Sequence, residues 1–483
     1  MVCAVCLGDA AVSDAVVIGA GPNGLAAAVR LAQAGMRVLV IEAADEIGGG
    51  TRSAELTVPG LVHDVCSAVH PFAAASPFLA RLPLADYGLR WRRADIDIVH
   101  PLADGSAGVL WHSLSSTCQD LGIDGARWKS LFGPLVERAE HLIDDALGPL
   151  LRIPSHPLTL ARLGLRAGLP ATAIARLFRT EQARAVFMGC AAHLYRPLTG
   201  VASAAVGTMM IAAGHRWGWP VAEGGSAAIS RALAGLLSSL GGEIVTGVTV
   251  ESLTDIPRAA VTMFDTTPQA VAEITGARLP ARRAAAYRRF RHGPAAYKAD
   301  LAVRQGIPWR NTHARRAATV HLGGTADAIV ASEAAISGGQ MPDTTFQLVG
   351  QQYLADPTRS AGDIHPIWTY AHVPHGYTGD ASQLLLDQIE QHAPGFRDRI
   401  VAARFTSPAQ FQEHNPNYIG GDIVGGDNNL RQLMGRPLLA IDNYRTGIPG
   451  MYLCSASTPP GAGAHGMCGY HAANRALKHI ARQ

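Results

Sequence analysis

The sequence predicts an α/β protein in which distant parts of the chain assemble one parallel sheet, with a second α+β region inserted between them. Three observations support this fold class. A short apolar strand, a glycine-rich turn, a helix and a second strand follow one another in residues 15–42. A helix and strands of the same kind return in residues 227–264, and a buried strand followed by a helix closes the chain in residues 451–480. Short apolar strands that alternate with helices are typical of buried parallel sheets.

The first element of this pattern is the apolar run Ala15 to Ile18, which is long enough for one buried strand. Leu25 to Ala34 is mostly apolar or small and predicts a helix, which Gly35 would end. Arg37 to Ile41 predicts a second strand. The chain therefore opens with a strand, a helix and a strand, which is the unit that builds parallel sheets.

Three glycines, Gly19, Gly21 and Gly24, join the first strand to the helix in the spacing G-x-G-x-x-G. The first permits a tight turn, the second lets the backbone approach a pyrophosphate, and the third lets helix and strand pack closely. Glu42 ends the second strand, where a carboxylate can accept hydrogen bonds from the hydroxyls of an adenosine ribose. The order of these features predicts a Rossmann-like dinucleotide-binding domain.

A second glycine cluster follows this acid and leads to an arginine: Gly48-Gly49-Gly50-Thr51-Arg52. Together with the first motif it resembles the fingerprint of the phytoene desaturase-like and amine oxidase-type FAD-dependent oxidoreductases, which are flavoproteins of the glutathione-reductase type. That fingerprint reads GxGxxG, an acid, then GG-x-x-R, and Arg52 matches its arginine. The resemblance implies non-covalent FAD, with Gly48 and Gly49 beside the pyrophosphate and the isoalloxazine ring.

Two further segments match the same family. The helix predicted in residues 227–240 and the strand after it recur there, and the resemblance places the backbone of Val250 against the adenine. Near the C-terminus, Gly466, Met467 and Gly469 match a flavin-contacting Gly-x-x-Gly, and Ser455 stands where a glycine is common. The start of the helix that follows would stabilise negative charge on the flavin.

His465 lies beside this C-terminal turn and is a candidate active-site residue, although a structural role fits it equally well. Strand alternation in residues 296–303 places Lys298 and Asp300 on one face. In flavin amine oxidases, a lysine at this stage of the chain hydrogen-bonds through water to flavin N5, and Lys298 resembles it. The alternative is a plain ion pair between Lys298 and Asp300. We take Lys298, Asp300 and His465 as the candidate catalytic residues.

The composition argues against several other classes of protein. The chain has 483 residues and a formal net charge of +3, without a long basic run, so we expect no nucleic-acid partner. Its seven cysteines are scattered, and Cys3 and Cys6 form a C-x-x-C with no second pair, so we expect neither a disulfide framework nor a metal site. We also expect no signal peptide and no membrane span, hence a cytoplasmic protein.

Residues 147–180 combine five arginines with apolar side chains and contain no Asp or Glu. Prolines interrupt the helical pattern of this segment. Basic, apolar, interrupted helices suit a peripheral contact with a membrane or a lid over an apolar tunnel. Exposed faces of ordinary helices would show the same pattern, and the sequence leaves these alternatives open.

The N-terminal and C-terminal motifs must meet at one cofactor, which predicts a discontinuous FAD-binding domain of residues 1–75, 221–290 and 435–483. Residues 76–220, mainly helical, and 291–434, with an antiparallel sheet, would form the substrate domain. The leading hypothesis is a dehydrogenase or desaturase that moves hydride from an apolar small molecule to flavin N5 and is reoxidised by oxygen or a quinone.

Two alternatives remain open at this stage. The first is an amine oxidase that uses Lys298; it requires an aromatic pair facing the flavin, for which the C-terminal turn offers Tyr470. The second is an FAD-bound interaction protein without turnover. The oligomeric state does not follow from the sequence.

Overall fold

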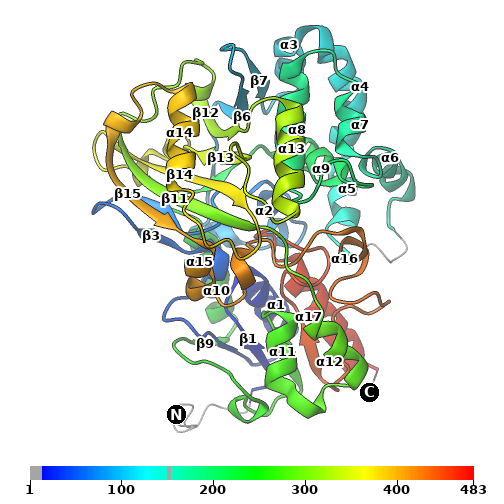
Figure 1. Cartoon of the computed structure of the whole chain (residues 1–483). Coiled ribbons are helices and arrows are strands. Elements are labelled where there is room, and N and C mark those ends of the chain that lie inside the picture. The colour runs from blue at the N-terminus through cyan, green and yellow to red at the C-terminus, as the bar shows by residue number, and fades with distance from the viewer. Residues whose placement is uncertain (1–12, 150–153, 483) are drawn as a thin grey trace.

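The computed structural model describes residues 13–149 and 154–482. Cys3, Cys6 and Arg152 lie outside the described residues. The lower part of the molecule in Figure 1 holds a parallel sheet with its helices, and the upper part holds a larger sheet flanked by most of the other helices. Both parts of the predicted architecture, the parallel sheet and the inserted α+β region, are therefore present.

The parallel sheet has five strands, and each neighbouring pair runs parallel. In order across the sheet they are β16 (Met451–Leu453), β10 (Val261–Phe264), β1 (Ala15–Ile18), β2 (Val38–Ile41) and β9 (Glu243–Val245). The central strand, β1, has the bounds that its apolar run predicts, and all four of its residues are buried. Strands from residues 1–75, 221–290 and 435–483 thus meet in one sheet, as the sequence predicts.

Alternate residues of these strands enter two different cores. Val17, Val40 and Met263 pack into the larger one with three helices, α1 (Pro22–Ala32), α10 (Ala227–Ser239) and α17 (Met467–Ile480). Val16, Leu39 and Phe264 point to the other face, toward α11 (Pro268–Thr275) and α12 (Ala281–Arg288). Burial on both faces explains why the strands are continuously apolar.

The second sheet has seven strands. In order they are β15 (Ile400–Thr406), β11 (Ala295–Arg304), β14 (Ile364–Val373), β13 (Gln347–Gly350), β12 (Ala317–Leu322), β6 (Ile96–Pro101) and β7 (Ala107–Leu110). All neighbouring pairs are antiparallel except β12 and β6, which run parallel. The sheet is therefore mixed, where the sequence predicts an antiparallel one. Two of its strands also come from residues 76–220, which the sequence predicts to be mainly helical.

Two short pairs complete the strands: β3 (Ser53–Glu55) with β4 (Val62–Asp64), and β5 (Trp91–Arg92) with β8 (Val221–Ala222). The remaining helices are α2 (Pro71–Ala74), α3 (Leu114–Asp120), α4 (Gly125–Val136), α5 (Ala139–Ala146), α6 (Pro157–Ala167), α7 (Ala171–Ala175), α8 (Glu181–Ala192), α9 (Ala204–Trp217), α13 (Ala326–Ser337), α14 (Ser382–His392), α15 (Pro408–His414) and α16 (Leu430–Gly435). Among the residues that the structure describes, no helix is long and apolar enough to cross a bilayer.

Candidate functional site: a cavity that joins the glycine loops to apolar helices

The first glycine loop packs so closely that side chains would not fit. Gly19 has a φ of +98°, which favours glycine, and a Cβ on Gly24 would lie 2.1 Å from the carbonyl oxygen of Gly19. A Cβ on Gly21 would lie 2.7 Å from Oδ2 of Asp265. The loop therefore brings backbone N–H groups at the start of α1 to the surface of a cavity, where they can bind an anion.

The second glycine cluster lies directly against the first. Gly48 has a φ of +117°, and a Cβ on Gly49 would lie 3.2 Å from Cα of Gly21. Gly21 and Gly49 both line the same cavity. The two motifs, which the sequence predicts to share one cofactor, are thus in contact.

Glu42 and Arg52 form a buried ion pair at this end of the cavity, with 3.3 Å between Oε1 of Glu42 and Nη2 of Arg52. The carboxylate also accepts hydrogen bonds from the backbone N–H groups of Ala20, at 2.7 Å, and Ala44, at 3.0 Å. These three donors fix the position of the carboxylate at the end of β2, where it lines the cavity with Val250. The ribose contact of this carboxylate stays a prediction.

Asp265 is a site residue that the sequence analysis misses. It follows β10, and its Oδ2 accepts a hydrogen bond of 2.8 Å from the backbone N–H of Gly24, the last glycine of the motif. Burial, with Glu42 nearby, raises the pKa of this carboxyl to about 7, although the Gly24 N–H opposes the rise. An acid directly after β10, which neighbours β1 in the sheet, was a visible signal, because parallel strands end at one edge.

The C-terminal motif divides into cavity residues and packing residues. Ser455 and His465 line the cavity. Gly466, with a φ of +68°, caps α17, and a Cβ on it would lie 2.8 Å from Cβ of Ala26. Gly469 lies against α1, since a Cβ there would be 1.8 Å from the carbonyl oxygen of Asn23. Gly466, Gly469 and the buried Met467 thus hold α17 against α1, and they are not among the described residues that line the cavity.

His465 is fully buried, and its orientation is fixed by hydrogen bonds. Nδ1 accepts from the backbone N–H of Met467 at 3.0 Å, and the hydroxyl of Ser76 donates to the His465 carbonyl at 2.7 Å. Burial lowers the pKa of the imidazole to about 4, so the ring is neutral and carries its proton on Nε2. Nε2 has no hydrogen-bond partner of ordinary geometry among the described residues, although the backbone carbonyl of Ala462 interacts with the ring and opposes the fall of its pKa. A bound molecule would compete with this carbonyl for the N–H.

Lys298 and Asp300 form an ion pair in which both side chains are buried. Nδ1 of His63 lies 3.5 Å from the second oxygen of Asp300, and burial raises the pKa of that carboxyl while Lys298 opposes the rise. Neither Lys298 nor Asp300 is among the described residues that line the cavity, whereas Cys66, whose thiol interacts electrostatically with both, does line it. The pair is therefore buried and does not belong to the described cavity lining, and the catalytic role of both residues stays a prediction.

The cavity has a volume of about 1230 Å³ and extends from the glycine loops to an apolar region. Its apolar walls come from three helices and the loops beside them: α6 (Leu160, Leu163, Gly164, Ala167), α9 (Ala205, Val206, Met209, Met210) and α16 (Leu430, Leu433, Met434). A dinucleotide at the glycine loops and an apolar molecule between these helices would share one chamber.

Aromatic side chains line the middle of this cavity: Tyr195, Trp368 and Tyr370. The rings of Tyr195 and Tyr370 are nearly parallel, with centroids 6.5 Å apart. Tyr195 has a φ of +57°, which is strained for a tyrosine, and stacks at 3.8 Å on His372, whose Nδ1 lies 2.7 Å from Oε1 of the buried Glu333. Tyr470 instead stacks on Phe78 and is not among the described lining residues.

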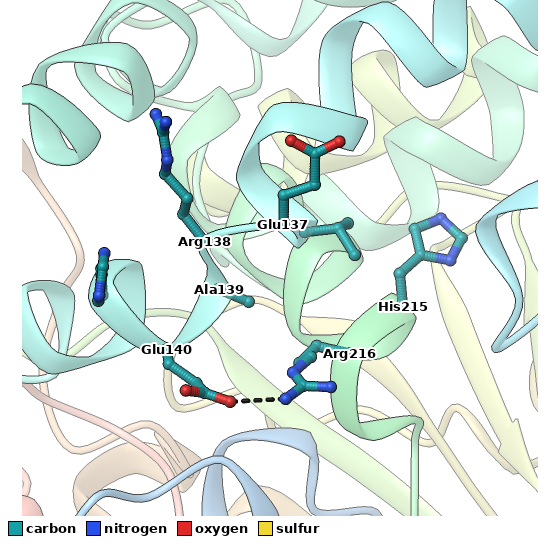
Figure 2. A pocket seen from close by; sticks show the side chains of 8 residues that line it. Glu137, Arg138, Ala139, Glu140, His215 and Arg216 are labelled. Atoms are coloured by element: carbon teal, nitrogen blue, oxygen red, sulfur yellow. Dashed lines mark hydrogen bonds and ion pairs between the residues drawn. The ribbon is translucent and has the colours of Figure 1, made fainter.

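A second, smaller cavity of about 480 Å³ lies between the end of α4, the start of α5 and the end of α9. Figure 2 shows Glu140 reaching toward Arg216, with 2.6 Å between Oε1 and Nη2. This cavity has charged walls and no glycine loop, so it does not offer the features of a nucleotide site.

Comparisons with known proteins agree with this architecture. Residues 17–82 match the family model described as an NAD(P)-binding Rossmann-like domain. A mouse protein, pyridine nucleotide-disulfide oxidoreductase domain-containing protein 2, is 35% identical over 91 residues, which are 19% of this chain and 16% of that protein. The chain thus matches only a small part of the length of this curated relative.

Two solved structures match nearly the whole chain. A putrescine oxidase variant superposes with a TM-score of 0.61 and 18% identity, over 98% of this chain and 99% of that one. A CLA-producing fatty acid isomerase from P. acnes superposes with a TM-score of 0.58 and 16% identity, over 96% and 98%. At this identity the likeness concerns the fold: a Rossmann-like nucleotide-binding part beside a mixed-sheet part.

The residues present fit FAD as the dinucleotide. The start of α1 offers N–H groups to a pyrophosphate, Glu42 lies where a ribose binds, and the second glycine cluster leaves room for a cofactor that continues past Cys66 and Ser455. His465, which also lines the cavity, offers a buried N–H donor there. A cofactor placed in this way would face the aromatic and apolar walls.

Proposed function

We propose that this protein is an FAD-dependent oxidoreductase that removes hydride from a C–H bond of an apolar organic molecule, in the manner of a dehydrogenase or desaturase. One observation carries the proposal: the glycine loops and the apolar helices line a single cavity of about 1230 Å³. Because no wall separates the two ends, a cofactor at the loops and an apolar substrate between α6, α9 and α16 can be in direct contact.

When bound, FAD supplies the redox chemistry by accepting hydride at N5. The chain's own residues bind and orient the reactants. Glu42, fixed by Arg52 and two backbone N–H groups, would hold the ribose, and the start of α1 would hold the pyrophosphate. The neutral His465 would donate from Nε2 to an oxygen or nitrogen that gains negative charge.

The apolar walls determine the class of substrate. Leu163 and Met210 are buried in the helices around the cavity, and Tyr195 and Tyr370 narrow it beside Cys66. These side chains exclude water from the reacting carbon and offer no charged group to a polar substrate. Reoxidation by oxygen or a quinone completes the proposed cycle.

A second candidate function is that of an amine oxidase. The rings of Tyr195 and Tyr370 favour it, because aromatic rings in a cavity wall can attract the cation of an amine. The fold is shared with a putrescine oxidase, and Lys298 would then assist the reaction with oxygen. This function requires hydrogen peroxide as a product.

The first test is whether the purified protein carries FAD, and whether it loses FAD when a larger side chain replaces Gly21 in the cavity wall. We expect about one FAD per chain after heat release, and less than a tenth of that in Gly21→Val, because the added side chain meets Oδ2 of Asp265. The matched control, Gly133→Ala in α4, meets only ordinary contacts and should keep its FAD. A protein that folds without any flavin would contradict the proposal.

A further inference from the structure

Helix α6 has apolar side chains on both of its faces. Its inner face lines the cavity with Leu160, Leu163 and Ala167. Its outer face carries Leu158, which is 78% exposed, and Leu165, which is 74% exposed, two helical turns further on. A helix that separates an apolar cavity from water does not need leucines on its water side, so this face calls for an explanation.

The exposed apolar side chains continue beyond α6 on the same side of the molecule. Leu169, Leu177 and Val201 are exposed in the segments that follow α6. Helix α16 lies on the same side of the molecule as α6 (Figure 1), and α16 and the loop after it expose four more apolar side chains: Leu430, Met434, Leu439 at 56% and Ile441 at 94%. Leu430 and Met434 also line the cavity, so part of this exposed apolar surface borders it.

The charges on this surface are all of one sign over a long stretch. Residues 154–180 contain Arg162, Arg166, Arg176 and Arg179 and no Asp or Glu. Among the described residues, none of these four guanidinium groups lies within ion-pair distance of a carboxylate; the Asp124 carboxylate accepts hydrogen bonds from the backbone N–H of Arg179. Arg162 and Arg176 therefore stay available to an external anion. Arg166 donates a hydrogen bond of 2.8 Å to the Arg162 carbonyl, and the Arg179 guanidinium interacts electrostatically with the Asp124 carboxylate.

We propose that α6, residues 168–179 and residues 430–441 form a docking surface for a lipid bilayer with anionic headgroups, through which the apolar substrate enters the cavity. The leucines would insert below the headgroups, and the arginines would pair with lipid phosphates. The proposal rests on the proposed function only for the nature of the substrate. Docking itself does not depend on turnover.

A second copy of the chain fits this surface poorly. A two-fold symmetric contact brings the same patch of two copies together, so the arginines of one copy would meet those of the other without an acid between them. An anionic bilayer supplies the missing negative charge and an apolar interior at the same time. Charge complementarity thus favours the lipid surface.

The test is co-sedimentation of the full-length protein with phosphatidylcholine vesicles and with vesicles of phosphatidylcholine and phosphatidylglycerol. We expect binding to the anionic vesicles only. The variant with Arg162, Arg166, Arg176 and Arg179 all changed to Gln should bind at least about tenfold more weakly. Leu158→Gln with Leu165→Gln should also weaken binding, because it removes the inserting side chains.

A control variant removes three exposed arginines from α12 and the residue that follows it, on the other part of the molecule: Arg282→Gln, Arg288→Gln and Arg289→Gln. This variant should bind anionic vesicles as the unchanged protein does. If the control lost as much binding to anionic vesicles as the variant with four arginines changed, the attraction would be nonspecific and the proposal would be overturned. The proposal would also be overturned if the unchanged protein were a dimer that did not bind vesicles, and if Leu158→Gln with Leu165→Gln converted that dimer to a monomer.

The outcome is separate from that of the proposed function. Vesicle binding with a flavin that no apolar compound reduces would keep the docking surface and contradict the oxidoreductase. Flavin reduction by an apolar compound without vesicle binding would contradict the docking surface alone.

Discussion

At the scale of single residues, Asp265 gives the clearest prediction about pH. Its carboxyl touches the last glycine of the motif and has a pKa raised to about 7 by burial. The protonated form is neutral, whereas the ionised form places a negative charge beside the site for the FAD phosphates. The dissociation constant of FAD should therefore rise with pH above 7, by up to about tenfold per pH unit.

The control for this prediction is Asp97. Burial raises the pKa of its carboxyl to about 7 as well, but Asp97 is not among the described residues that line the cavity. Fluorescence quenching of FAD by the apoprotein between pH 6 and 9 measures the affinity. Asp97→Asn should keep the pH dependence, and Asp265→Asn should abolish it. A pH dependence that survives in Asp265→Asn would assign it to another group.

Lys298 gives a prediction about stability. Lys298→Met leaves the buried carboxylate of Asp300 without its cation, which should lower the free energy of unfolding by about 3–5 kcal/mol. Replacing both members, Lys298→Met with Asp300→Leu, should recover most of this loss. Urea unfolding of the two variants measures the difference.

The same variants test the role of Lys298 in the reaction. If Lys298 assists the reaction with oxygen, the double variant should be reoxidised more slowly, while the rate of flavin reduction by substrate changes less. Equal and small changes in both half-reactions would leave Lys298 and Asp300 as a structural ion pair.

At the scale of elements, the contact between α1 and α17 joins the N-terminal and C-terminal motifs. Gly469→Ala places a Cβ 1.8 Å from the Asn23 carbonyl oxygen, so α17 must move away from α1. We expect a loss of about 1–3 kcal/mol in unfolding free energy together with weaker FAD binding. Gly133→Ala in α4 should instead leave stability unchanged or raise it by about 0.5–1 kcal/mol. Thermal unfolding followed by flavin fluorescence compares the two, and equal effects would contradict this role for Gly469.

The parallel sheet could be predicted from the sequence because its strands are apolar on both faces. The strands β6 and β7 could not. Strand β6 contains Asp97, His100 and Pro101, which interrupt the apolar pattern, and the parallel pairing with β12 holds it in the sheet. Pairing with a distant part of the chain therefore determines that residues 96–101 form a strand, and the local sequence pattern does not.

The candidate site shows the same division. Gly19, Gly21, Gly24, Glu42 and Arg52 could be predicted, because each acts through local backbone geometry or a fixed spacing. The aromatic wall could not, since Tyr195 and Tyr370 come from separate segments that the fold brings together. The sequence also gave no sign that Lys298 and Asp300 are buried and do not belong to the described cavity lining.

At the scale of the whole molecule, the two sheets and the helices between them enclose one cavity whose ends differ in chemistry. The parallel sheet supplies the glycine loops, and α6, α9 and α16 supply the apolar end. Helices α6 and α16, which line the apolar end, also expose Leu158, Leu165 and Leu430. Contact between a bound cofactor and an apolar substrate requires this cavity to be continuous.

The measurement that tests the central claim most directly is the visible absorption spectrum of the purified protein under anaerobic conditions, during additions of long-chain apolar compounds and of amines. We predict flavin bands near ~450 nm that lose their intensity with an apolar compound and recover with oxygen or a quinone. Bleaching by amines alone would favour the amine oxidase. Flavin bands that no compound bleaches would contradict the oxidoreductase and leave an FAD-bound interaction protein.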